Sequence, residues 1–375
     1  MNSSEDKSIC FVIPHFVTFS TGGAEIQIHY LTQSFIKRGW KVEVICAGLG
    51  LEQRMKASPF YNGAITYHYY KKRTIRFMEY WDVLKLLKLT NCNYYYQRTD
   101  FALTAATYSF AKRNRKKMVF ALASDSDAER NKYSKAFKQF KYTGIVKKLV
   151  RKVDFKVLDK MIEWAKSGVK HVVFQNEYQA QTYLTNFNKK GVIIPNSFLP
   201  SNQESTTKEN VILWCGNDSP VKRPQLFVDL AKQLSDFKDW TFVMIGSACN
   251  QINEKNISAN LKVLGSVSYQ EANNWFAKSK IYINTSEVEG MPNTFIQSWY
   301  YETLVCSLSV DPNACFSNEN TGIFADDDLN EMYQVLKDIM QKGVNEQIIT
   351  NGTKYFKMYF DLEQNTEKLI NYITA

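Results

Sequence analysis

The stretch NVILWCGNDSPVKRPQLFVDLAKQLSDFKDWTFVMIG, residues 210–246, decides the fold class because its hydrophobic period changes twice. Its two ends, NVILWCG (210–216) and WTFVMIG (240–246), are short apolar runs rich in β-branched and aromatic residues, as buried strands are. Between them, PQLFVDLAKQLSDF (224–237) spaces its apolar residues as an amphipathic helix does. A strand, a helix and a second strand in this order predict a βαβ unit with parallel strands.

The first part of the chain carries the same pattern, with strands predicted over 8–14 and 41–48 and a helix over 24–39. The 375 residues exceed the roughly 250 that one hydrophobic core usually holds. A polar segment without periodicity, FLPSNQESTTKEN (198–210), indicates a linker between the two halves. We therefore expect two doubly wound α/β domains that face one another, with ligands in the cleft beyond the carboxyl ends of the strands.

The composition is typical of a globular protein, and the apolar runs are far shorter than the roughly 18 residues that a membrane span needs. The first residues, MNSSEDKSICFVIP, carry acidic side chains where a signal peptide would be basic, so we expect a cytoplasmic protein. The seven cysteines are odd in number and scattered, which indicates reduced thiols that pack in the core.

The loop EVEGMP, residues 287–292, follows a predicted strand over 280–286 and precedes a helix that starts near Asn293. The free N–H groups at such a helix start attract phosphate. Glycine in this loop lets a ligand approach the backbone, and a carboxylate at Glu289 suits neutral hydroxyls such as those of a sugar. The alternative is that Glu289 caps the helix that follows it.

Two further strand-to-helix loops have residues suited to anions. Gly22 and Gly23 permit a tight turn with exposed N–H groups at the start of the first helix, although a simple turn would also explain them. Lys222 and Arg223 precede the helix over 224–237, where they suit a diphosphate; a solvated surface pair is the alternative.

Taken together, these segments resemble the retaining nucleotide-sugar glycosyltransferases of glycosyltransferase family 4, which have the GT-B fold. The resemblance lies in GGAE (22–25), RGWKVEVIC (38–46), VIIPNSF (192–198), GNDSPVKRP (216–224) and EGMPNTFIQSW (289–299). It implies two facing Rossmann-like domains with a cleft between them. The domains implied are an acceptor-binding domain over 1–198, a linker over 199–210, a nucleotide-sugar-binding domain over 211–358, and a last helix over 359–375 that returns to the first domain.

The resemblance also implies the donor site. In the family the glycine turn and the lysine hold the donor diphosphate, while the first Glu of an E-x7-E motif contacts the sugar hydroxyls and the second contacts the ribose. The matching donor-binding residues are Gly22, Gly23, Gly216, Lys222, Arg223, Glu289, Gly290, Met291, Pro292, Asn293, Thr294 and Gln297.

Two positions depart from the family pattern. The second Glu of the motif is Gln297, a neutral side chain that still accepts a hydrogen bond but holds a hydroxyl less strongly than a carboxylate does. The arginine that follows the glycine of the lysine loop is replaced by Asn217, which removes a positive charge that Arg223 is placed to supply. These losses weaken the expected stabilisation of the leaving group.

The acceptor side is expected in the first domain. Asp125 and Asp127 follow a predicted strand, and His15 follows the first strand, so all three are candidates for acceptor contacts. Asp125 joins Glu289 and Lys222 as a candidate catalytic residue. The run DSD (125–127) also matches the D-x-D of metal-dependent transferases of a different fold, but the phosphates here have other partners. We expect no metal and no cofactor besides the donor substrate.

The segment from Arg130 to Lys170 is strongly basic, with thirteen Lys/Arg against three acidic residues. Within it, residues 144–166 place one apolar stripe among basic residues, namely Ile145, Val146, Leu149, Val153, Val157, Met161 and Ala165. Such a helix can bind an anionic membrane, or it can pack its stripe on the first domain with its lysines solvated, and both can hold in part. No nucleic-acid-binding motif accompanies the charge.

We therefore expect a metal-independent, hexosyltransferase-type enzyme that moves a sugar from a nucleotide diphosphate to a saccharide acceptor. A lipid-linked acceptor, assembly of a surface polysaccharide such as capsule or lipopolysaccharide, and a peripheral place on the inner face of the plasma membrane fit this hypothesis. Two alternatives stay open. One is a GT-B nucleotide-sugar epimerase, and the other is a non-catalytic nucleotide-sugar-binding or scaffold protein.

Overall fold

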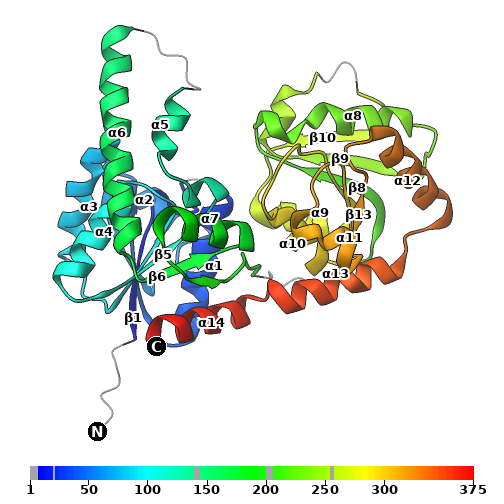
Figure 1. Ribbon diagram of the computed structural model, residues 1–375. Helices are drawn as coiled ribbons and strands as arrows, with labels where there is room; N and C mark the ends of the chain where they lie inside the picture. The colour runs from blue at the N-terminus through cyan, green and yellow to red at the C-terminus, as the bar shows by residue number, and fades with distance from the viewer. Residues whose placement is uncertain (1–6, 20–21, 139–143, 200–205, 254–256) are drawn as a thin grey trace. The chain divides into compact units, whose positions relative to one another are not determined.

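A computed structural model describes residues 7–19, 22–138, 144–199, 206–253 and 257–375 (Figure 1). The chain divides into two compact units. Unit 1 comprises Met1–Asn196 together with Leu362–Ala375, and unit 2 comprises Ser197–Asp361. Each unit is built on its own parallel sheet with helices packed against it, as the alternating pattern of the sequence predicts.

Unit 1 contains a seven-stranded parallel sheet in the order β3-β2-β1-β4-β5-β6-β7. Its strands are β1 (Ser8–Val12), β2 (Lys41–Ala47), β3 (Ile65–Tyr70), β4 (Tyr94–Arg98), β5 (Lys117–Ala121), β6 (His171–Phe174) and β7 (Val192–Ile193). Its helices are α1 (Gly23–Lys37), α2 (Glu52–Lys56), α3 (Glu79–Leu87), α4 (Ala102–Arg113), α5 (Lys132–Phe137), α6 (Ile145–Gly168), α7 (Glu177–Phe187) and α14 (Leu362–Thr374), with short 3-10 turns η1 (Arg76–Met78) and η2 (Asp125–Ala128).

Alternate residues of the central strand β1 supply the two cores of unit 1. Phe11 packs in one core with Phe35 of α1 and Leu369 of α14, whereas Cys10 packs in the other core with Leu87 of α3. This follows from the two-residue period of a strand, which turns successive side chains to opposite faces. Both faces are covered by helices, which is why the strands read as continuous apolar runs.

Unit 2 contains a six-stranded parallel sheet in the order β10-β9-β8-β11-β12-β13. Its strands are β8 (Glu209–Cys215), β9 (Thr241–Ile245), β10 (Leu261–Gly265), β11 (Ser279–Asn284), β12 (Leu304–Ser307) and β13 (Ile323–Phe324). Its helices are α8 (Pro224–Gln233), α9 (Tyr269–Lys278), α10 (Asn293–Tyr300), α11 (Cys315–Glu319), α12 (Leu329–Lys342) and α13 (Glu346–Tyr359), with 3-10 turns η3 (Pro220–Lys222), η4 (Ser247–Gln251) and η6 (Pro312–Ala314).

The end of the chain forms two helices with a break between α13 and α14 at Phe360 and Asp361. α14 lies in unit 1. There, Glu363 contacts Arg38 and lies 3.3 Å from the Nζ of Lys37, while Leu369 is buried in the core. The break therefore separates a helix of unit 2 from one of unit 1.

All seven cysteines are unpaired, and all except the half-buried Cys215 are buried. Burial raises the pKa of the Cys46 and Cys306 thiols to about 12, which keeps them protonated. Within the described residues, no helix combines the length and the apolar composition that crossing a bilayer requires.

Candidate active site

The loops that follow β8 and β11 meet in unit 2 at an ion pair. Lys222 Nζ lies 2.9 Å from Glu289 Oε2, and the two side chains keep 18% and 17% of their surface exposed. The other oxygen, Glu289 Oε1, accepts a hydrogen bond of 2.9 Å from Asn284 Nδ2 at the end of β11. A cation and a carboxylate thus lie side by side at the carboxyl edge of the sheet, still reachable by solvent.

Hydrogen bonds beneath the pair fix the two loops against one another. The Thr285 hydroxyl donates to the Lys222 carbonyl at 2.7 Å and accepts from the buried Trp214 indole N–H at 2.9 Å. The Glu287 amide donates to the Val221 carbonyl at 2.8 Å. Because these contacts use backbone and buried groups, the positions of Lys222 and Glu289 are set by the fold itself. Sequence analysis missed Asn284 and Thr285, although both directly follow the apolar run of β11.

Two glycines allow the strand ends to approach closely. A Cβ on Gly216 would lie 2.4 Å from the Trp214 ring. Gly246 has φ +108°, and a Cβ there would lie 2.1 Å from the Gly216 carbonyl oxygen. Both contacts are too short for any larger residue. Gly216 therefore has a packing role, and the donor contact implied for it by the family resemblance stays a prediction.

The second loop enters α10 through Pro292, which occupies the N-cap position with extended backbone. No side chain among the described residues caps this helix, and its first turn contains no acidic residue. Glu289 therefore does not cap α10, and its partners are Lys222 and Asn284. Met291, Asn293 and Thr294 are partly buried around the helix start, and Gly290 is exposed.

Gln297 lies one turn further along α10. Its Nε2 donates to Asn273 Oδ1 of α9 at 3.1 Å, and Asn273 is fully buried. The Nδ2 of Asn273 has no hydrogen-bond partner within the described residues. The Gln297 amide is therefore held by a neighbouring helix through its N–H, which leaves its carbonyl oxygen as the group that accepts.

Arg223 does not supply the missing charge beside Lys222. Its Nε donates to the Thr285 carbonyl at 2.8 Å, and its Nη2 lies 2.8 Å from Asp327 Oδ1 and also contacts the Ser309 hydroxyl. Hydrogen bonds from Arg223 and then Ser309 lower the pKa of Asp327. Arg223 also has φ +46°, because it ends η3 and begins α8. Arg223 thus connects the start of α8 to Thr285 and Asp327. Asn217, which replaces the arginine of the family pattern, is exposed.

In unit 1, α1 begins at Gly23, and Gly22 is its N-cap. A Cβ on Gly22 would lie 2.4 Å from Glu25 Oε2, so the Glu25 carboxylate lies against this turn. Burial raises the pKa of Glu25 and outweighs the lowering by a backbone N–H and by Arg98. An acidic side chain thus contacts the glycine turn where the sequence predicts phosphate contacts.

His15 follows β1 and faces a lysine. Lys72 Nζ lies 3.0 Å from His15 Nε2, so the ring nitrogen accepts from the ammonium. Burial and the charge of Lys72 lower the pKa of His15. His15 is therefore neutral at pH 7.

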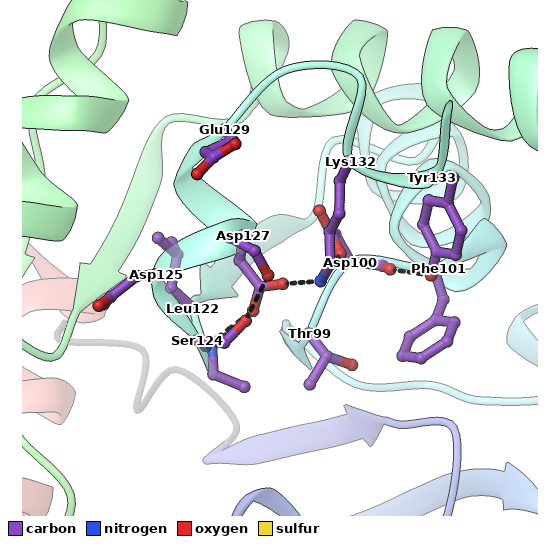
Figure 2. Close-up of polar contacts among 12 residues, drawn as sticks. Thr99, Asp100, Phe101, Leu122, Ser124, Asp125, Asp127, Glu129, Lys132 and Tyr133 are labelled. Atoms are coloured by element: carbon purple, nitrogen blue, oxygen red, sulfur yellow. Dashed lines mark hydrogen bonds and ion pairs between the residues drawn. The ribbon is translucent and has the colours of Figure 1, made fainter. Parts of the chain in front are cut away.

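Asp125 and Asp127, predicted as equivalent, have different environments. Asp127 is buried, accepts from the amides of Ala123 and Ser124 at 2.7 Å and 3.1 Å, and contacts Lys132 (Figure 2). Asp125 is half-buried and accepts from Gln179 Nε2 at 2.9 Å. Asp127 is thus occupied by its own turn and by Lys132, whereas Asp125 is still reached by solvent.

Lys132 links Asp127 to a third carboxylate that sequence analysis missed. Asp100, just after β4, lies 2.6 Å from Lys132 Nζ and 3.1 Å from the Nζ of the buried Lys166. Burial and the Asp127 charge raise the pKa of Asp100 to about 6 despite the two lysines. Burial acts against ionisation of Asp127 too, but Lys132 lowers its pKa to about 2. The four charges join the loops after β4 and β5 to α5 and α6.

Sequence comparisons with known proteins match the part of the chain that contains this site. Residues 209–342, which lie within unit 2 and include the Lys222–Glu289 pair, match the family model described as glycosyl transferases group 1. An uncharacterized glycosyltransferase of Haemophilus influenzae is 22% identical over 180 residues, which cover 46% of this chain and 49% of the relative. The chain thus aligns with about half the length of this curated relative.

Solved structures match the chain over nearly its whole length. HepE of Anabaena, in complex with UDP and glucose, has a TM-score of 0.69 at 13% identity and is covered over 99% of its length by 98% of this chain. WaaG, a glycosyltransferase involved in lipopolysaccharide biosynthesis, has a TM-score of 0.68 at 15% identity and is covered over 100% by 98% of this chain. The chain has the GT-B fold. The two parallel α/β sheets predicted from the sequence are confirmed, and the match to the group 1 glycosyl transferase model lies within unit 2.

Proposed function

We propose that this GT-B protein is a retaining glycosyltransferase of family 4 that transfers a sugar from a nucleotide diphosphate to a saccharide acceptor. The observation that carries the proposal is the pair of Lys222 and Glu289 at the carboxyl edge of the unit 2 sheet, 2.9 Å apart and partly exposed. A donor has two chemically different ends, an anionic diphosphate and a neutral sugar. This pair offers a cation to the first and a carboxylate to the second.

The proposed chemistry needs charge stabilisation more than an acid and a base. As the bond between the sugar C1 and the phosphate oxygen breaks, negative charge develops on the diphosphate, and Lys222 stabilises it. The acceptor hydroxyl forms the new bond to C1 on the face that the diphosphate leaves, and its proton passes to the departing phosphate oxygen. Glu289, oriented by Asn284, holds the sugar hydroxyls during this exchange. No metal is required in this scheme.

We also propose a donor class and an acceptor class. A uridine diphosphate hexose is the first donor to test, because the similar Anabaena protein is described with UDP and glucose. A saccharide acceptor, including a lipid-linked one, fits the description of WaaG in lipopolysaccharide biosynthesis. The partly exposed Asp125 and neutral His15 are the proposed acceptor contacts in unit 1. The proposed location is the cytoplasmic face of a membrane.

A non-catalytic nucleotide-sugar-binding protein is the second candidate. One observation favours it: Arg223 contacts Asp327, so its guanidinium does not provide a second cation beside Lys222. Such a protein would bind a donor without releasing its nucleotide.

The test is a screen of the purified chain with UDP-, GDP- and ADP-sugars, followed by thermal shift and by nucleotide release with and without EDTA. Glu289→Gln and Lys222→Met are compared with Glu287→Gln, which changes an exposed carboxylate two residues away. We expect one donor to stabilise the protein and to release nucleotide in EDTA, with loss of release only in the first two variants. Stabilisation without release would favour the binding protein, and no stabilisation by any donor would contradict both candidates.

A further inference from the structure

Helix α6 (Ile145–Gly168) has two halves with different surroundings. In the second half, Phe155, Leu158 and Ile162 are buried and pack with Tyr133 and with Ala102 of α4. Residues 144–150, 152 and 153 are exposed, and in Figure 1 this part of α6 extends past the ends of α3 and α4. The apolar stripe predicted from the sequence is therefore not one packing face. Its last residue, Ala165, is buried, but the stripe residues that precede Asp154 are exposed.

Residues 145–153 of α6, called here the α6 tip, expose an unusual amount of apolar side chain. The exposed fractions are 87% for Ile145, 74% for Val146, 61% for Leu149, 46% for Val150 and 52% for Val153. At about 100° per residue these five side chains fall within an arc of roughly 140°. Scattered exposed apolar residues need no explanation, whereas a continuous arc of five indicates a binding surface.

The opposite arc of the α6 tip is basic. Lys147, Lys148 and Lys152 are exposed, and no ion pair involves them within the described part of the chain. Arg151 is held against unit 1, because it donates to the Thr74 carbonyl at 3.1 Å and lies 3.2 Å from Asp154. Residues 145–153 contain no acidic side chain.

The acidic residues of α6 contact neighbouring segments of unit 1. Asp154 accepts from the amides of Arg76 and Phe77, Asp159 accepts from the amides of Tyr133 and Ser134, and Glu163 pairs with Arg130. The carboxylates are thus used within the fold, while the lysines of the tip are presented to solvent. The surface that a partner meets is apolar on one side and cationic on the other.

We propose that the α6 tip inserts into the interface of an anionic lipid bilayer. The apolar arc would enter the boundary between head groups and acyl chains, and the long lysine side chains would reach the anionic head groups beside it. A second copy of the chain is a poor occupant, because two tips paired through their apolar arcs would also gather three lysines from each copy, none of which has an ion-pair partner within the described residues, on one short pair of helices. This inference deepens the proposed membrane location, and it is tested separately from the proposed transfer reaction, because lipid binding requires neither donor nor acceptor.

The test is sedimentation of the purified full chain with sucrose-loaded vesicles of phosphatidylcholine alone or with 30% phosphatidylglycerol. We expect the partition coefficient to be at least tenfold higher on the anionic vesicles and to fall steeply as salt is raised. Lys147→Gln/Lys148→Gln/Lys152→Gln and Val146→Ser/Leu149→Ser are each expected to lower binding at least tenfold. All five positions are exposed, so the melting temperature should not change.

Matched variants distinguish the tip from net charge and from general hydrophobicity. Lys232→Gln/Lys238→Gln/Lys354→Gln removes the same charge from exposed sites in unit 2, and Leu89→Ser/Met358→Ser removes two exposed apolar side chains elsewhere. Both controls should bind as the unchanged chain does. Equal binding by tip and control variants, or no binding to anionic vesicles, would overturn the proposal. So would light scattering that shows a dimer which Val146→Ser/Leu149→Ser dissociates, because the tip would then be a contact between copies.

Discussion

The ammonium of Lys222 lies 2.9 Å from the carboxylate of Glu289, although 66 residues separate them in the sequence. The parallel sheet brings them together, since β8 and β11 are hydrogen-bonded neighbours and both loops leave the same edge. The adjacent Arg223 points to Asp327. Two cations that are adjacent in the sequence therefore have different ion-pair partners.

Replacing Lys222 with Met should reduce turnover without unfolding the protein. If Lys222 stabilises the leaving diphosphate, kcat should fall roughly 10²- to 10³-fold, as when one charge-stabilising donor is removed. The melting temperature should change little, because partly exposed ion pairs contribute at most about 1 kcal/mol. Nucleotide release and differential scanning fluorimetry on the same sample measure both quantities. Unchanged turnover would show that Lys222 is not a catalytic residue.

Replacing Arg223 with Met should lower the stability of the protein and should have little effect on turnover. The guanidinium loses its bonds to the Thr285 carbonyl and to Asp327, which should lower the free energy of unfolding by about 1–2 kcal/mol. Turnover should fall less than about tenfold, because the side chain is directed away from Lys222. Urea unfolding and nucleotide release measure the two effects. A large loss of turnover in a stable variant would place Arg223 in the donor site instead.

Replacing Gln297 with Glu should be tolerated and should tighten donor binding. The buried Nδ2 of Asn273 has no hydrogen-bond partner among the residues that the structure describes, and a turn of that amide by 180° would let it donate to the new carboxylate. A charged acceptor holds a ribose hydroxyl more strongly, so the donor Kd should fall roughly fivefold, about 1 kcal/mol.

Isothermal titration with the preferred donor measures the affinity of this variant, and Gln297→Leu is its control. The leucine variant should bind the donor more weakly than the unchanged chain, because it lacks an acceptor. Loss of more than about 2 kcal/mol of stability in Gln297→Glu would show that Asn273 cannot turn.

Asp127→Ala and Asp125→Ala should separate a structural carboxylate from an exposed one. Asp127 holds two amides and Lys132 while buried, so its removal should cost roughly 2–3 kcal/mol of unfolding free energy. Asp125 makes hydrogen bonds from partly exposed positions, so its removal should cost less than about 1 kcal/mol. If Asp125 contacts the acceptor, the acceptor KM should rise in that variant alone. Equal stability losses in urea would contradict this assignment.

The fold could be predicted from the sequence because the hydrophobic period typical of a strand or a helix continues over the whole length of each element. The pattern over 210–246 predicts β8, α8 and β9, and its boundaries shift only by a few residues at the helix end, where α8 stops at Gln233. The helix predicted to start near Asn293 does start there, but it ends at Tyr300 and the next strand, β12, begins at Leu304. Apolar residues serve both elements, so composition alone does not mark this boundary.

The site could be predicted only in part. Lys222 and Glu289 could be predicted because each lies in a sequence motif that the family resemblance identifies, and the parallel sheet brings the two loops together. The partners Asn284, Asn273 and Asp100 could not be found in the same way, because their roles depend on side-chain directions and on neighbours far away in sequence. Burial also separated Asp125 from Asp127, two residues that the sequence presents alike.

His29 should make the stability of unit 1 depend on pH. Its ring is half-buried, with ring centroids 5.1 Å from Phe60 and 6.2 Å from Phe16, and burial lowers its pKa from 6.5 to about 4. In the unfolded chain His29 is therefore protonated as the pH falls below about 6.5, whereas in the folded chain it is protonated only near pH 4. Between these values the unfolded state holds more protons, so stability is present above pH 6.5 and is lost as the pH falls towards 4.

The measurement is the unfolding free energy of the chain and of His29→Gln between pH 7 and pH 4. Glutamine does not titrate, so the difference between the two proteins isolates His29 from other groups such as Asp100. Between pH 7 and pH 4 the unfolding free energy of the unchanged chain should fall by up to roughly 3 kcal/mol more than that of His29→Gln. NMR titration of the four histidines supplies an independent reading, in which the His29 ring signals should move only near pH 4. A His29 midpoint near 6.5 with parallel stability curves would show that the ring is solvated in the folded protein.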